Sequence, residues 1–508
     1  FNEAEGVFVL PWVRTHATKD YLFMGKLLQR FPQVRVTFNF VPSLLRQLQL
    51  YMEGKEDRVM ALAKKRASLL TEKDKQDILS QFFWVSSPHT YASFPRYREL
   101  KEKALLGGQD FGEQDFLDLQ VLYQLIWFDP ITLREDPGIR LLQEKGRHYQ
   151  EEDKEIVWRA TQKIFAEIFS QYRGLLASGQ IEISFSPFYH PILPLLVDTE
   201  IARVAHPGVS LPATRFAFPQ DARAQIQKGK EFSETIWGVA MNGMWPSEGS
   251  VSEEALSLIA GEGVSWVATD EEILRKSLGK EPGEALYLPY RYGKVSIFFR
   301  DRMLSDAIGF EYHRLSTQEA IADLTRKIDN LKSRVLARDM GKPYVVSIVL
   351  DGENAWEYYV DNGLPFLSEF YQILSQDPEL ATVTPSQYLL EHRSLPELGS
   401  VVPGSWIFGN FDTWIGHWEK NQAWEELGKM RVRFEAVRTH LPAEVRAKVE
   451  ELFYQVEGSD WFWWLGEDHP SPQKGIFWGH FSSLIAQIAR LLQGKSPVEE
   501  EGPCTPKM

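Results

Sequence analysis

The sequence predicts an α/β fold, an incomplete TIM-like (β/α)7 barrel that carries a helical insertion and a C-terminal α-helical domain. Short runs rich in β-branched and aromatic residues alternate with longer runs of helical spacing over the first two thirds of the chain. The chain opens with expected strands at residues 7–10 and 35–40 around an expected helix at 21–31, the β-α-β order of a parallel sheet. An open doubly wound sheet is the weaker alternative.

The remaining barrel elements follow the same two periodicities. Five further strands are expected, at residues 181–185, 214–218, 264–268, 295–299 and 344–350. Long helices are expected at residues 151–177, 316–337 and 360–375, where apolar residues recur every three or four positions. About seven strand–helix units result, which favours the barrel.

At 508 residues the chain is too long for one compact core. We expect a catalytic barrel over residues 1–395, including a charged helical insertion at about 44–179 that covers one face. Residues 396–495 are expected to form a helical domain packed on the barrel, with helices at 419–456 and 481–493. Residues 496–508 are acidic and contain proline, which predicts a disordered tail.

The overall composition excludes several classes of partner. A formal net charge of −14 argues against nucleic-acid binding, and no apolar run is long enough for a membrane helix. The single cysteine, Cys504, allows neither a disulfide framework nor a thiolate metal cluster. The chain opens at Phe1, so the sequence decides neither for nor against a signal peptide, and a cytoplasmic location is the default expectation. The 16 tryptophans exceed what a core needs, and flat indoles suit pyranose rings.

Two carboxylates carry the candidate chemistry. Glu248 lies in a turn-like stretch beside Trp245, and Asp351 directly follows the expected strand at 344–350, close to Trp356. Barrel enzymes place their chemistry beyond the carboxyl ends of strands. A Glu beside Pro and Gly, or an Asp-Gly after a strand, is by itself typical of a solvated turn. As a pair, they suggest a nucleophile and an acid about 5 Å apart around a glycosidic bond.

The chain resembles glycoside hydrolase family 57, a retaining, α-glucan-active family with an incomplete (β/α)7 barrel and a C-terminal helical region that contributes to the substrate groove. Four of its five motifs are matched closely, by GQIEI leading into SPFYHP (179–191), MWPSEG (244–249), LDGEN (350–354) and SDWFWWLGED (459–468). The resemblance implies that Glu248 is the nucleophile and Asp351 the general acid/base.

The first motif departs from the His-Gln-Pro of many members. Residues 12–17 are WVRTHA, which looks more like the amylopullulanase-like branch and leaves His16 as the surviving histidine. The resemblance also implies a set of substrate-binding residues: His16, Glu182, His190, Trp245, Trp356, Trp406, Asp460 and Trp463. For each there is a structural alternative, such as a hydrogen-bonded histidine, a Glu paired with an Arg, or a tryptophan anchor for the helical domain.

The leading functional prediction is a retaining hydrolase of α-1,4-glucans, with or without α-1,6 activity. A 4-α-glucanotransferase or branching enzyme would use the same two acids and differ in whether water or sugar completes the second step. A non-catalytic glucan-binding relative and a metal-dependent barrel enzyme such as a deacetylase are weaker alternatives. The sequence holds no P-loop, no dinucleotide fingerprint and no His-Glu-x-x-His pair, so no cofactor or metal is expected. It does not decide the oligomeric state.

Overall fold

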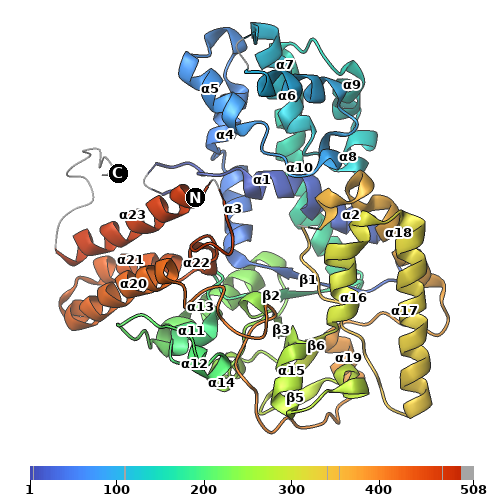
Figure 1. Cartoon of the computed structure of the whole chain (residues 1–508), viewed down its shortest axis with the longest axis vertical. Coiled ribbons are helices and arrows are strands. Elements are labelled where there is room, and N and C mark those ends of the chain that lie inside the picture. The colour runs from blue at the N-terminus through green and yellow to red at the C-terminus, as the bar shows by residue number, and fades with distance from the viewer. Residues whose placement is uncertain (4, 108–109, 340, 354, 472, 494–508) are drawn as a thin grey trace.

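The computed structural model describes residues 1–493 except 4, 108–109, 340, 354 and 472. A single sheet has the strand order β1-β2-β3-β4-β6-β5 (Figure 1). Its strands are β1 (Val36–Phe40), β2 (Ile181–Phe185), β3 (Gly243–Met244), β4 (Trp266–Asp270), β5 (Tyr290–Tyr292) and β6 (Val295–Arg300). All neighbours pair in parallel except β5, which forms an antiparallel hairpin with β6.

The parallel strands alternate with crossover helices. The main helices are α2 (Leu22–Gln29), α10 (Glu151–Ala177), α13 (Pro219–Trp237), α14 (Glu253–Gly261), α15 (Glu271–Leu278), α17 (Thr317–Arg338) and α18 (Leu364–Gln376). Every residue of β4 and β6 is buried, as expected of parallel strands that are covered on both faces. The predicted fold class is confirmed: five parallel strands form an incomplete barrel that does not close.

The expected insertion forms a helical lobe at the top of Figure 1. Its helices are α4 (Arg58–Lys64), α5 (Glu72–Gln81), α6 (Pro95–Leu105), α7 (Glu113–Leu125), α8 (Pro130–Glu135) and α9 (Pro137–Lys145). Arg14, in α1 (Trp12–His16), joins this lobe to the barrel. Its buried guanidinium donates to Asp57, which caps α4, and to Gln124 in α7, each at 2.6 Å. A buried charge needs such partners, so the pair fixes the lobe's position.

The helices after residue 416 pack beside α13 and α11 (Leu193–Val197) (Figure 1). They are α20 (Trp418–Val437), α21 (Ala443–Val456), α22 (Ser459–Trp463) and α23 (Lys474–Leu492). Arg431 of α20 makes a bidentate ion pair with Asp221 of α13, at 2.7 and 2.9 Å, and both side chains are buried. The predicted tail at 496–508 lies outside the described residues.

Three expected strands do not form. Residues 7–10 pair with the residues that lead into α4 instead of with β1, through Phe8, which donates to Glu56 at 3.0 Å. Residues 214–218 are extended, and the carbonyl of Phe216 accepts from Thr199 in the loop before α12 (Ile201–Ala205). Each of these two segments thus has backbone hydrogen-bond partners outside the sheet.

The third of these segments, residues 344–350, makes a single bridge, between Ser347 and Arg300. The reason is that β5 occupies the outer edge of β6 at Val295–Ile297. Residues 298–300 of β6 lie beyond β5, and of these only Arg300 forms a bridge with the incoming segment.

One face of the sheet packs around Trp266 of β4. Its indole extends across Gly243 of β3, and its Nε1 donates to Glu182 of β2 at 2.8 Å. Glu182 also accepts from the backbone N–H and hydroxyl of Ser386, so it holds α19 (Pro385–Glu391) against this face. The missing side chain at Gly243 is what leaves room for the indole.

We expect Gly243→Ala to destabilise the fold by about 2–3 kcal/mol, because its methyl group would lie 2.0 Å from two ring carbons of Trp266. Gly174→Ala is the matched control, since it lies within α10 with no heavy atom nearby and should be neutral or slightly stabilising. Differential scanning calorimetry compares the two variants with the wild type. Equal unfolding midpoints for the two variants would contradict this account of the sheet.

Candidate active site

Glu248 lies beyond the carboxyl end of β3, in a 3-10 turn (Ser247–Gly249). Its backbone has φ 59° and ψ 26°, a left-handed conformation that costs a non-glycine residue about 1–3 kcal/mol. Two hydrogen bonds with Trp406 hold it there. The Trp406 backbone N–H donates to the Glu248 carbonyl at 3.0 Å, and the indole Nε1 donates to the Glu248 carboxylate at 2.8 Å. The two hydrogen bonds stabilise this backbone conformation and direct the Glu248 carboxylate toward Trp406.

Asp351 follows the extended segment 344–350 and is exposed to solvent. It lines a cavity of about 350 Å³ whose wall also includes Trp406. The charge of Asp351 acts on Glu248: burial first, and then this neighbouring carboxylate, raise the pKa of Glu248 to about 8, whereas the Trp406 hydrogen bond opposes the rise. The two predicted catalytic acids are thus brought into one electrostatic neighbourhood.

Arg300, at the end of β6, connects the surroundings of both acids. Its buried guanidinium lies over the Trp406 ring, 5.3 Å from the ring centroid, and Trp406 donates to Glu248. Its Nε also donates to the carbonyl of Val349 at 2.9 Å, two residues before Asp351. Asp270 at 3.4 Å and Asp306 balance its charge. No sequence motif includes Arg300, and only its place at the end of a buried strand distinguishes it in the sequence.

A polar cluster lies on one flank of the acids. Glu353 accepts a hydrogen bond from the Tyr21 hydroxyl, and its charge raises the pKa of both His16 and Asp460. Burial is the largest influence on Asp460, whose pKa rises to about 6, and Asp460 in turn acts on Glu248. The Asp460 side chain is exposed to solvent, but enough protein surrounds its carboxyl group to raise its pKa. This cluster unites the first, third, fourth and fifth motifs.

His16 is oriented by a π-helical turn, Ala17–Tyr21. Its Nδ1 lies 2.8 Å from the carboxylate of Asp20, which is fully buried. Burial lowers the pKa of His16, but the carboxylates of Asp20 and Glu353 raise it by more, so the net pKa is raised. π-turns are frequent at functional sites because they re-aim side chains. The turn directs His16 toward Glu353 of the polar cluster.

His190 joins the second motif to the fifth. Its φ is 57°, its Nδ1 lies 2.8 Å from the Ser459 hydroxyl, and its carbonyl accepts from the Ser459 N–H at 3.1 Å. Burial lowers its pKa to about 4, so the ring is neutral at physiological pH. His190 therefore anchors the start of α22, directly before Asp460.

The structure gives the other predicted substrate-binding residues supporting roles. Glu182 lies near the amino-terminal end of β2, and its carboxylate accepts hydrogen bonds from Trp266 and Ser386. Trp356 is 1% exposed and donates to the Gly352 carbonyl at 3.1 Å, so it shapes the Asp351 loop from beneath. Both side chains are thus engaged in hydrogen bonds within the protein.

The remaining predicted tryptophans lie nearer the cleft. Trp245 packs edge-on against Trp406, with ring centroids 5.3 Å apart, and so supports the donor to Glu248. Trp463 is partly exposed and stacks on His469 at 4.0 Å. Trp406, expected to bind substrate, both lines the cavity and donates to Glu248.

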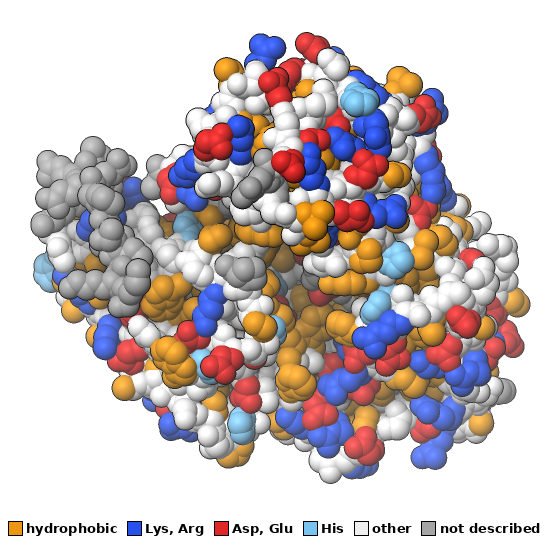
Figure 2. Space-filling view, turned by 45° about the horizontal axis from the view of Figure 1, so that its top comes forward, with side chains coloured by type: hydrophobic (Ala, Val, Ile, Leu, Met, Phe, Trp, Pro, Cys, Tyr) orange, Lys and Arg blue, Asp and Glu red, His pale blue; other side chains and the backbone are white. Residues whose placement is uncertain are grey.

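The cavity at Asp351 has walls that the sequence analysis did not predict. They include Phe310 and Gly309 from a second π-helical turn (Ala307–Glu311), together with His313 and Tyr358. Figure 2 shows apolar side chains gathering in a hollow on this face, below the helical lobe. No sequence signal marked these residues, because they come from segments outside the five motifs.

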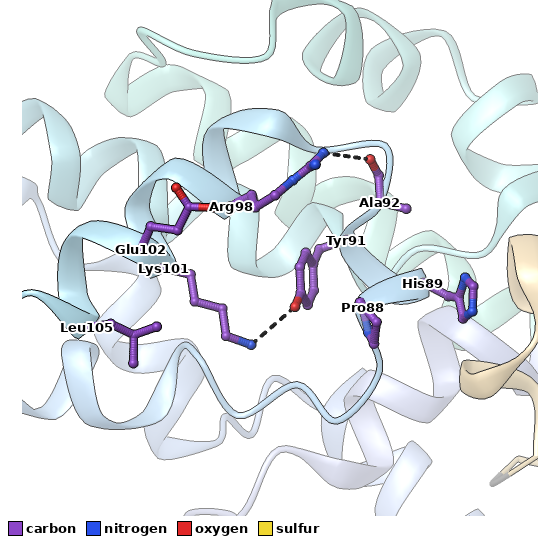
Figure 3. Close-up of a pocket in the computed structure, with 8 residues that line it drawn as sticks. All are labelled: Pro88, His89, Tyr91, Ala92, Arg98, Lys101, Glu102 and Leu105. Atoms are coloured by element: carbon purple, nitrogen blue, oxygen red, sulfur yellow. Dashed lines mark hydrogen bonds between the residues drawn. The ribbon is translucent and has the colours of Figure 1, made fainter.

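A second hollow, of about 520 Å³, lies on the lobe itself (Figure 3). It is bounded by the 3-10 turn Pro88–Tyr91 and by α6, where the Lys101 ammonium donates to the Tyr91 hydroxyl at 3.4 Å. None of the predicted site residues lines it. Within the described part of the chain, no three His, Cys, Asp or Glu side chains are grouped to hold a metal ion, and no helix could cross a membrane.

Comparison with known proteins matches residues 1–397 to glycosyl hydrolase family 57. A curated α-amylase from Pyrococcus furiosus is 25% identical over 233 residues, 45% of this chain, and the match spans only 30% of that relative's length.

Solved structures share the fold at low identity. A GH57 branching enzyme from Thermococcus kodakaraensis aligns with TM-score 0.58 and 15% identity over 94% of this chain and 85% of that one. An α-amylase from Thermotoga maritima aligns with TM-score 0.58 and 13% identity over 95% and 88%.

We expect Glu248→Gln to stabilise the protein increasingly as the pH rises. The folded Glu248 keeps its proton up to a pKa of about 8, whereas the unfolded chain loses it near 4.5, so wild-type stability falls between these values. Near pH 8 the variant should exceed the wild type by about 2–4 kcal/mol, and near pH 5 the two should converge. Denaturant unfolding at both pH values measures this. A stability difference that is the same at pH 5 and pH 8 would contradict the burial of this carboxyl.

Proposed function

We propose, from the premise that the chain belongs to glycosyl hydrolase family 57, that it cleaves α-1,4 bonds of α-glucans by a retaining double displacement. One observation carries the proposal: Asp351 acts electrostatically on Glu248, which lies beyond the carboxyl end of β3, and Asp351 itself lines a cavity together with Trp406, the residue that donates to Glu248. This is the arrangement in which two acids can act on one glycosidic bond.

In the first step, Glu248 attacks the anomeric carbon and Asp351 donates a proton to the departing oxygen. In the second, Asp351 takes a proton from water or from an acceptor sugar, which displaces Glu248. The first step requires a protonated Asp351 and an ionised Glu248. Burial and the charge of Asp351 raise the pKa of Glu248 to about 8, so Glu248 must lose a proton before it attacks, and the hydrogen bond from Trp406 Nε1–H favours that ionised form.

The polar cluster is suited to the sugar that Glu248 attacks. His16, Glu353 and Asp460 supply donors and acceptors on the flank where the pyranose hydroxyls need to be held. Hydrogen bonds to these hydroxyls strengthen as the sugar distorts toward an oxocarbenium ion. His190 and Ser459 hold Asp460 in position for this role.

Amylase-type hydrolysis is the leading form of the reaction, with α-1,6 cleavage as a further possibility on the amylopullulanase pattern. Transfer to a sugar is the second candidate, since this chain shares its fold with a branching enzyme and with a 4-α-glucanotransferase from Thermococcus litoralis (TM-score 0.52, 16% identity). The aromatic residues that line the cavity beside Asp351 independently favour transfer to a sugar.

We expect Glu248→Gln and Asp351→Asn each to lower turnover on maltoheptaose by about 10³-fold or more, because each removes one half of the acid–nucleophile pair. With α-maltosyl fluoride, whose leaving group needs no proton, Asp351→Asn should keep the first step and Glu248→Gln should lose it. Burst kinetics of fluoride release separate the two.

Glu182→Gln is the control for this pair, since it removes a carboxylate of the same sheet that is occupied by Trp266 and Ser386. It should lower thermal stability and leave turnover per folded molecule within about twofold. Near-normal turnover in Glu248→Gln would overturn the proposed nucleophile.

We expect the wild type to raise the number of reducing ends when it is incubated with starch or maltoheptaose, since water completes the second step of a hydrolase. Chromatography of the products together with a reducing-end assay checks this. Constant reducing ends with longer products would instead establish disproportionation, and new α-1,6 linkages would establish branching.

A further inference from the structure

We infer that the aromatic cavity beside Asp351 is the subsite for the sugar on the leaving-group side, and that it holds the acceptor sugar in the second step. The inference rests on the proposed function, because it needs Asp351 as the acid/base. It adds residues that no motif of the sequence includes: Phe310, His313 and Tyr358.

The two flanks of the acid pair differ in chemistry. On one flank, His16, Glu353 and Asp460 form a connected set of charged and polar groups that acts on Glu248. Asp351 also lines the cavity of about 350 Å³, whose wall combines the rings of Phe310, His313 and Tyr358 with Arg300 and Arg314. This volume is within the range of small-molecule sites, about 300–1,000 Å³.

The chemistry of the reaction indicates which sugar each of the two groups of residues binds. The sugar under attack carries the developing positive charge and needs its hydroxyls held by polar groups, which fits the side with Asp460. The acid/base touches the glycosidic oxygen, so the next sugar lies beyond Asp351. A leaving sugar carries no developing charge on its ring, and apolar contact with its C–H faces is what a binding site can offer it.

The rings of the cavity are available for such contact. Phe310 is 63% exposed and Tyr358 41% exposed, although both are large aromatic residues beside a cavity. His313 stands against Tyr358 with ring centroids 5.6 Å apart. Exposed apolar side chains grouped in a hollow are typical of a binding site.

The wall is also braced from outside the barrel. The Tyr358 hydroxyl hydrogen-bonds to Ser86 of the helical lobe, and the 3-10 turn Pro88–Tyr91 packs against the turn Trp356–Tyr358. Phe310 stands on its π-helical turn, which Arg300 approaches through Asp306. The cavity therefore has a fixed shape before any sugar enters.

In the second step an acceptor held here competes with water. Its hydroxyl oxygen forms a bond to the anomeric carbon, the ester bond to Glu248 breaks, and Asp351 takes the hydroxyl proton. When water takes the place of the acceptor, the glycosyl–enzyme is hydrolysed and the free sugar is released. The ratio of transfer to hydrolysis thus depends on how well this cavity holds a sugar.

The test uses α-maltosyl fluoride as donor and maltose as acceptor. Forming the glycosyl–enzyme from this donor releases fluoride and needs no sugar in the cavity. Phe310→Ala and Tyr358→Ala should therefore change fluoride release without acceptor by no more than about twofold. The maltose concentration that gives half-maximal transfer should rise about five- to tenfold.

Two controls accompany these variants. Tyr358→Phe keeps the ring and loses only the hydroxyl, so it should retain most of the transfer. Trp158→Ala removes a ring that packs under the Lys64 ammonium, 3.4 Å from the ring centroid, outside the cavity, and should leave both reactions unchanged. Circular dichroism confirms that each variant is folded.

The results distinguish a failure of the proposed subsite from a failure of the proposed function. If the wild type does not turn over the fluoride, the proposed function fails and the subsite with it. If the fluoride is turned over but Phe310→Ala and Tyr358→Ala transfer to maltose as well as the wild type, the proposed function stands and the subsite is wrong. An equal loss of fluoride release and transfer would also overturn the subsite, since it would place these rings on the donor side.

Discussion

The guanidinium of Arg300 is the interaction on which the site depends. It is buried at the end of β6, lies over the indole that donates to Glu248, and binds the carbonyl that precedes Asp351 by two residues. A buried cation is stable only when paired, and Asp270 and Asp306 provide that pairing. One side chain thereby fixes the approach of two segments that are about a hundred residues apart.

The electrostatics around Glu248 follow from the same packing. Its left-handed backbone and its position under Trp406 keep the carboxylate away from bulk water, which raises its pKa, and the charges of Asp351 and Asp460 add to the rise. A carboxyl whose pKa is raised to about 8 destabilises the folded protein when it is ionised. Stability is given up at this point for a defined protonation state.

The fold positions these groups by leaving the barrel incomplete. Since β5 occupies the edge of β6, the segment before Asp351 crosses the strand end with one bridge and turns into the cleft. The helices after residue 416 bring Ser459 and Asp460 to the polar flank, where His190 fixes them. The helical lobe braces the opposite wall through Ser86 and Tyr358. Each part of the chain thus contributes to one cleft.

Local pattern determined much of this protein from sequence alone. Periodicity predicted the parallel strands β1, β2, β4 and β6 and the long helices, since a buried strand or an amphipathic helix carries its own signature, but it did not predict the two-residue strand β3. The five motifs marked Glu248, Asp351, His16, His190 and Asp460, and hydrogen bonds and charges connect the segments that carry these residues. Tertiary structure alone decided which extended runs pair in the sheet, because that depends on which edges remain free. It also decided that Glu182 and Trp356 are occupied inside the protein and that Arg300, Phe310 and Tyr358 shape the site. These roles come from contacts between segments far apart in the chain, and a one-dimensional pattern holds no record of such contacts.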